Sequence, residues 1–116
     1  MVVDQLSDDE VDRLFHALAD ATRRDIVRRS VDGAHSVSEL ARRYPISLTA
    51  VQKHVAVLED AGLVAKVRHG REQRVVGRPE ALARAQHLLH EYERLWTARL
   101  DRISEILDED PRGGTA

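Results

Sequence analysis

Apolar residues recur at helical spacing through most of this chain. In its first half they predict four successive helices, each opened by a residue suited to capping a helix N-terminus. The first runs from Ser7 or Asp8 to Ala19, and the acids in its first turn are favoured by the helix dipole. The second begins at Asp20 and ends at Gly33.

The third and fourth helices follow closely. Ser36 and the glutamate three residues later have capping-box spacing, so a short helix is expected to begin there and stop near Tyr44-Pro45. Ser47 can cap a fourth helix that continues to Ala61 and ends at the following glycine. This helix is amphipathic, with Val51, Val55 and Leu58 on its apolar side and Thr49, Gln52, Lys53, Ala56 and Asp60 on its polar side.

The period then changes. Two short strands are predicted within residues 63–77, around a turn at 69–72, and together they indicate a β-hairpin. Pro79 is suited to an early helix position, and residues 80–107 contain neither glycine nor proline, so one long helix is expected there. Residues 109–116 are predicted to form a disordered tail.

The order of these elements indicates the fold class. A short capped helix, a tight turn, a second capped helix and a β-hairpin follow one another in a winged helix-turn-helix. Residues 1–108 are therefore expected to form a single winged helix-turn-helix domain, mainly α with a small β-hairpin, in which residues 80–107 are a long C-terminal dimerisation helix. A length of 116 residues suits one modest core.

Charge is distributed unevenly, although the total is only −2. Residues 1–20 hold six acids and one Arg, a net −5, and residues 79–116 hold eight acids and five Arg, a net −3. Residues 21–78 hold twelve Lys or Arg and six acids, a net +6. Basic charge concentrated in the helix-turn-helix segment favours one surface that meets phosphate.

The polar side of the fourth helix is suited to double-stranded DNA because short side chains near its start leave room in a major groove. Gln52 can pair with adenine edges, and Lys53 can reach guanine or phosphate. Ser47 and Thr49 can donate to phosphate or contact a thymine methyl. The hairpin adds basic candidates for the neighbouring backbone or minor groove, namely Lys66, Arg68, Arg71 and Arg74.

Three blocks of sequence resemble the ArsR family of bacterial winged-helix repressors. They run from Leu14 to Arg24 (LFHALADATRR), from Val37 to Ala41 (VSELA) and from Ser47 to Val64, in the family's order. The resemblance covers residues 8–107 and implies a homodimer on a partly palindromic operator, with the second helix of the motif reading the major groove. It places Arg71 at the wing tip. It also implies that the residues facing DNA are Ser47, Thr49, Gln52, Lys53 and His54.

His54 lies at the flank of the predicted buried stripe, not at the centre of the polar side. Two roles stay open for it. It can contact a phosphate, or it can only bridge the helix to the wing.

The last predicted helix carries an apolar heptad repeat. Such a repeat over about four heptads is typical of a two-helix seam. The alternative is that the stripe packs on its own domain, but the small amino-terminal core cannot cover a face of this length. We therefore expect a homodimer, with the first helix contributing. Further apolar residues widen the stripe, namely Ala85, Leu95, Leu100, Ile106 and Leu107. The expected interface consists of Leu14, Leu82, Leu89, Tyr92, Trp96 and Ile103.

The family's metal sensors are poorly matched. Some members bind metal through two cysteines on the helix before the turn, and Ser36 and Ser38 stand at those positions. A zinc or nickel site near the end of the chain has weak candidates in His87, His90, Glu91 and Glu93, but the upstream acid-plus-His pair that would complete it is absent. We expect no metal and no cofactor, and leave open an unidentified small-molecule effector.

Other functions have less support. The sequence has no cysteine, no phosphate-cradling glycine loop and no nucleophile elbow, so an enzyme is not expected. It has no transmembrane run and no signal sequence, so we expect a cytoplasmic, nucleoid-associated protein with no membrane partner. Two alternatives remain: a winged-helix protein-interaction or dimerisation module, and a small-ligand-responsive regulator of another winged-helix class.

Overall fold

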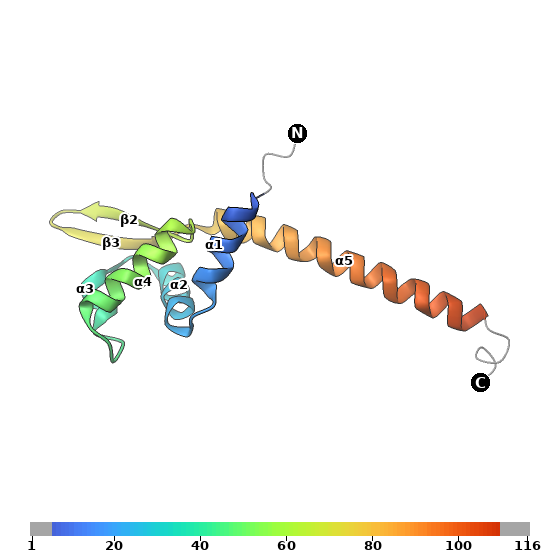
Figure 1. Cartoon of the computed structure of the whole chain (residues 1–116). Coiled ribbons are helices and arrows are strands. Elements are labelled where there is room, and N and C mark those ends of the chain that lie inside the picture. The colour runs from blue at the N-terminus through green and yellow to red at the C-terminus, as the bar shows by residue number, and fades with distance from the viewer. Residues whose placement is uncertain (1–5, 110–116) are drawn as a thin grey trace. The chain divides into compact units, whose positions relative to one another are not determined.

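The computed structural model of this chain describes residues 6–109. All but the first residue of the predicted disordered tail, 109–116, therefore lies outside the described residues. The described residues form five helices and one three-stranded sheet (Figure 1). They divide into two compact units, one up to Ala85 and one from Gln86 onward.

The predicted helix starts are confirmed by their caps. In each case a side chain accepts a hydrogen bond from the backbone N–H three residues later, which satisfies a donor that the helix itself leaves free. The capping residues are Ser7, Asp20, Ser36 and Ser47. The helices that follow them are α1 (Asp8–Leu18), α2 (Ala21–Asp32), α3 (Val37–Ala41) and α4 (Leu48–Asp60).

The third helix is shorter than predicted. It ends at Ala41 instead of near Tyr44-Pro45, because the backbone tightens after its single turn. The N–H of Arg43 donates to the carbonyl of Leu40 at 3.0 Å, and that of Tyr44 donates to Ala41 at 3.4 Å. These three-residue hydrogen bonds form the turn of the helix-turn-helix.

The predicted hairpin is confirmed and gains a third strand. β2 (Val64–His69) and β3 (Glu72–Gly77) pair antiparallel around a two-residue loop whose Gly70 has φ +66°. β1 (His35–Ser36) pairs with the other edge of β3, so the strand order is β1-β3-β2. The sequence did not predict β1, because two residues show no periodicity. We call the β2–β3 hairpin the wing.

The fourth helix ends where the sequence predicts. Gly62 adopts φ +75°, the left-handed conformation that glycine accepts readily. Its N–H donates to the carbonyl of Glu59, and the N–H of Leu63 donates to that of Leu58, both at 3.0 Å. These two bonds are a Schellman motif. The chain therefore passes from α4 into β2 through a short, hydrogen-bonded connection.

The core of the first unit surrounds the fourth helix. α4 contacts α1, α2, α3 and β2, and its Val51, Val55 and Leu58 are completely buried. Burying an apolar side chain of this size stabilises the fold by roughly 1.5–3 kcal/mol. The other large side chains in the core come from the surrounding segments and are Leu14, Ile26, Leu40, Leu63 and Val75.

One predicted interface residue lies in this core. Leu14 was expected to contribute to a dimer interface, but it is 1% exposed and packs inside its own unit. A side chain buried there cannot contact a second chain while the domain is folded, so the prediction for Leu14 was wrong. The next residue of α1, Phe15, is 40% exposed.

The last helix, α5 (Pro79–Glu109), begins at the predicted proline. Its first two turns belong to the first unit, where Ala81 and Ala85 are buried, so Ala85 lies in the core and not on the stripe where it was predicted. No helix among the described residues has the length and apolar character needed to span a bilayer. From Gln86 onward, the large apolar side chains at least 44% exposed are Leu89, Tyr92, Leu95, Trp96, Leu100, Ile103, Ile106 and Leu107.

Candidate nucleic-acid interface

The two sides of α4 differ in burial as the sequence predicts. Val51 and Val55 are completely buried, whereas Thr49, Gln52 and Lys53 are exposed. The first turn of α4 contains no acidic residue, so the positive end of the helix dipole is not neutralised there. This end of α4 is therefore a surface that favours the approach of a polyanion.

Ser47 combines two tasks at the start of α4. Its Oγ accepts the backbone N–H of Ala50 at 3.0 Å, which caps the helix. A hydroxyl that accepts one hydrogen bond can still donate its own proton. Because Ser47 is exposed, that proton is available to a phosphate oxygen.

The turn before α4 holds a basic pair that the sequence prediction missed. Arg42 and Arg43 follow the end of α3, and both are exposed. Neither makes an ion pair with any residue that the structure describes. Two adjacent arginines beside a predicted helix-turn-helix turn were the signal that could have identified them.

The four basic residues of the wing lie in different environments. Lys66 is on the same face of the hairpin as the buried Val75, and its Nζ lies 3.7 Å from Glu59 Oε1 on α4. Arg74 lies on the opposite face, with an Nη2–Oε2 distance of 3.5 Å to Glu72 and a buried Nε. These two cations are thus partly engaged within the domain.

The remaining two basic residues are at the end of the wing. Arg71 occupies the two-residue loop and is exposed, which places it at the wing tip as predicted. Arg68 is exposed on β2, and its Nε donates to the carbonyl of Gly70 at 3.3 Å. The wing therefore presents its least engaged cations at its tip.

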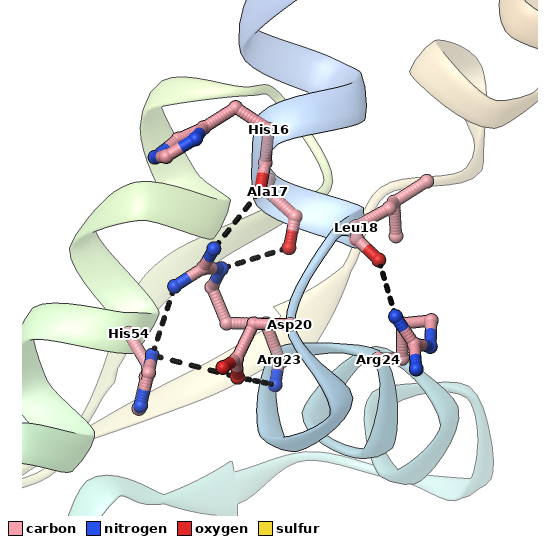
Figure 2. Close-up of polar contacts among 7 residues, drawn as sticks. All are labelled: His16, Ala17, Leu18, Asp20, Arg23, Arg24 and His54. Carbon is pink, nitrogen blue, oxygen red and sulfur yellow. Dashed lines mark hydrogen bonds and ion pairs between the residues drawn. The ribbon is translucent and has the colours of Figure 1, made fainter.

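His54 contacts the α1–α2 corner, not the wing (Figure 2). Its Nδ1 lies 3.2 Å from Arg23 Nη1 and 3.9 Å from Asp20 Oδ2, and its side chain is 23% exposed. Of the two roles left open for His54, the bridge to the wing is therefore not seen among the described residues, and the ring instead joins α4 to the start of α2. The reason is that His54 projects from the flank of α4 that packs on α2.

Comparison with known proteins places these features in a family. The family described as Helix-turn-helix domain matches residues 18–67. The chain is 38% identical over 99 residues to the HTH-type transcriptional regulator Rv2034 of Mycobacterium tuberculosis, covering 85% of this chain and 90% of that protein. It also resembles the solved structure of an ArsR-like transcriptional regulator from Rhodococcus sp. RHA1, with 34% identity, a TM-score of 0.80 and coverage of 86% and 92% of the two chains.

The chain belongs to the ArsR family of winged helix-turn-helix transcriptional regulators. The solved homodimeric winged helix-turn-helix DNA-binding domain of Mb0332 from Mycobacterium bovis is also similar, at 28% identity, with a TM-score of 0.60 and coverage of 76% and 87% of the two chains. The predicted fold class, family and role as a DNA-binding transcriptional regulator are confirmed. Family and fold point to such a regulator rather than to an enzyme.

In this ArsR-family chain a second polar network holds the turn before α4. The hydroxyl of Tyr44 donates to Asp25 Oδ2 at 2.6 Å, and Arg29 Nε donates to the same oxygen at 2.8 Å. The hydrogen bond from Tyr44 lowers the pKa of the Asp25 carboxyl, and the one from Arg29 lowers it further. Burial and the neighbouring carboxylate raise the pKa of the Tyr44 hydroxyl. The network joins α2 to the helix-turn-helix turn.

Replacing Tyr44 with phenylalanine is expected to lower the free energy of unfolding by about 1 kcal/mol, because one charge-assisted hydrogen bond to Asp25 is lost. Because the pKa of Asp25 is lowered in the folded protein, its ionised carboxylate stabilises the fold at any pH above the ordinary aspartate pKa. This stabilisation is lost progressively as the pH falls below about 4. The difference between wild type and Tyr44→Phe should therefore shrink in urea titrations below that pH. An undiminished difference at pH 3 would contradict this account.

The weak metal candidates do not form a cluster. His90 Nδ1 lies 3.8 Å from Glu93 Oε1, which is one pair. Within residues 6–109 no group of three or more His, Cys, Asp or Glu residues is placed to hold a metal ion. His87 and Glu91 are exposed on the same helix.

Proposed function

We propose that this regulator is a homodimeric repressor that binds a partly palindromic DNA operator, with α4 in the major groove and the wing along the neighbouring backbone. The observation that carries the proposal is the division of α4. Val51, Val55 and Leu58 hold one side completely inside the domain, while the polar side is exposed and free of acids in its first turn. A helix held in this way can enter a groove without unfolding anything.

Each exposed residue has a proposed task. Gln52 and Lys53 read base edges, Gln52 with a preference for adenine. The hydroxyls of Ser47 and Thr49 position the helix by contact with phosphate or a thymine methyl. The wing and the turn add phosphate contacts through Arg42, Arg43, Arg68 and Arg71.

Three of the predicted DNA-contacting residues are proposed to have mainly a structural role. Lys66 and Arg74 are near carboxylates of their own domain, and His54 is near Arg23. Each of them is already engaged by a partner within its own domain. We therefore propose that they support α4 and the wing, and that any phosphate contact they make is secondary.

The second part of the proposal concerns assembly. Exposed apolar residues recur every seven positions along α5, with Leu82 37%, Leu89 50%, Trp96 65% and Ile103 44% exposed. An apolar stripe of this length on one helix is the pattern of a two-helix seam. The similar domain of Mb0332 is described as homodimeric. We propose that the stripe, together with Phe15 of α1, pairs two copies of this chain and places one α4 on each half of an operator.

We propose that the protein acts on the nucleoid in the cytoplasm and that its DNA binding requires no metal or cofactor. The proposal does not include a small-molecule effector, because none of the residues described above is assigned to bind one.

Fluorescence anisotropy on duplexes from the DNA upstream of its own gene tests the function. A palindromic segment should bind at least about a thousandfold more tightly than a shuffled duplex of the same composition. Its affinity should fall steeply as salt rises from 50 to 200 mM, because bound phosphates release counterions. Equal, weak binding to all duplexes would reject DNA reading and favour a protein-interaction module.

Arg71→Ala is expected to weaken all duplexes by a similar factor, because the wing tip contacts phosphate and not bases. The slope of log affinity against log salt should become shallower by about one for each wing of the dimer. Arg94→Ala, which removes the same charge from the exposed surface of α5, is the control. A change in preferred sequence without a change in salt slope would mean that Arg71 reads bases.

A further inference from the structure

Arg23 connects three helices through separate nitrogens of one guanidinium group. Its Nε donates to the carbonyl of Ala17 at 2.8 Å, and its Nη2 donates to that of His16 at 2.9 Å, both at the end of α1. Its Nη1 lies 3.2 Å from His54 Nδ1 on α4. Figure 2 shows these bonds converging on the Arg23 side chain. The backbone N–H of Arg23 also donates to Asp20 Oδ2 at 3.0 Å.

The direction of the contact with α4 fixes the state of the imidazole. A guanidinium has only donors, so His54 Nδ1 must be the acceptor and the ring proton must be on Nε2. Asp20 Oδ2, at 3.9 Å from Nδ1, is the other charged group facing this ring among the described residues.

This contact acts on α4 in a way that the apolar core does not. Val51 and Val55 hold the helix against the domain, but apolar burial is non-directional and tolerates small rotations about the helix axis. A hydrogen bond from Arg23 to His54 is directional. His54 directly follows Lys53 and is two residues from Gln52, and these are the two proposed base readers.

We propose that Arg23 is a positioning residue for DNA reading: through His54 it holds α4 in the rotation that presents Gln52 and Lys53 to the bases. The inference rests on the proposed reading side of α4. Arg23 itself does not contact the base edges, and its contribution to specific binding is the fixed angle of the helix relative to α1 and α2.

Arg24 provides a matched control. It is the neighbouring arginine, and its Nη1 donates to the carbonyl of Leu18 at 2.8 Å, so it also caps the end of α1. Figure 2 shows it pointing away from His54. Arg23→Lys and Arg24→Lys therefore make the same chemical change at the same helix end, and only the first removes a bond to α4.

The test measures affinity of the intact protein for its best duplex and for a shuffled duplex. Arg23→Lys should weaken the best duplex about tenfold, the scale of coupling between contacting residues, and leave the shuffled duplex and the salt slope unchanged. Arg24→Lys should leave both affinities within about twofold. If Arg23→Lys instead weakens both duplexes and makes the salt slope shallower, Arg23 contacts phosphate and the proposal is overturned. Equal effects of the two variants, or no effect of either, also overturn it.

Variants of His54 keep the proposal testable if Arg23→Lys unfolds. His54→Asn places a carboxamide oxygen where Nδ1 was, so it should retain specific affinity, whereas His54→Ala should lose it about tenfold. Where Arg23→Lys does fold, adding His54→Ala to it should cost little more affinity, because the two substitutions remove the same contact. Equal losses for His54→Asn and His54→Ala would contradict the hydrogen bond. If wild type itself does not discriminate between duplexes, it is the proposed function that fails, and not the role of Arg23.

Discussion

Replacing Trp96 with glutamate is expected to separate the regulator into monomers and to lower its affinity for a palindromic operator by at least about a hundredfold. Trp96 is 65% exposed in the single chain and stands in the apolar stripe of α5. If the stripe is the seam of the dimer, the substitution buries an unpaired carboxylate from each copy, which the low-dielectric seam does not tolerate. Two linked reading helices bind far more tightly than either alone, so losing the partner removes most of the affinity.

The measurement is sedimentation velocity together with anisotropy on the operator. Because the chain has one tryptophan, wild type offers a third observation: its emission should shift to longer wavelength as dilution exposes Trp96. Ala98→Glu is the control, since it adds the same charge to the exposed surface of α5 about one-half turn away from Trp96. A Trp96→Glu protein that remains dimeric would place the interface elsewhere and remove the basis for two half-sites.

Replacing Gln52 with alanine is expected to abolish the preference for particular bases at one position in each half-site. The cost on the best operator should be about 1–3 kcal/mol, the usual value of one side chain pairing with a base edge. The side chain of Gln52 is exposed on α4 and makes no hydrogen bond with any residue that the structure describes, so the effect should fall on DNA binding and not on stability.

A panel of duplexes, each with one base pair changed, measures this prediction. Wild type should discriminate at the position Gln52 reads, and Gln52→Ala should bind all four base pairs there almost equally. Gln86→Ala, the same change at an exposed position of α5, should leave the pattern intact. An unaltered base preference in Gln52→Ala would show that the reading side of α4 is misassigned.

Local features of this fold could be read directly from the residues. The starts of α1, α2, α3 and α4 follow from side chains that cap the backbone within three residues, and the end of α4 follows from one glycine with positive φ. The division of α4 into a buried and an exposed side follows from the spacing of Val51, Val55 and Leu58. Each of these depends on neighbours in sequence, which is why pattern and propensity were sufficient.

Partners distant in sequence were decided only by the tertiary structure. Leu14 and Phe15 are neighbouring apolar residues of α1, but the packing of the first unit buries Leu14, at 1% exposed, and leaves Phe15 40% exposed. The pairing of β1 with β3 and the approach of Lys66 to Glu59 likewise needed the folded arrangement. The contact between Arg23 and His54 joins residues 31 positions apart. The physical reason is that a sequence pattern shows which side of an element is apolar, whereas the element that covers that side depends on how all of them pack at once.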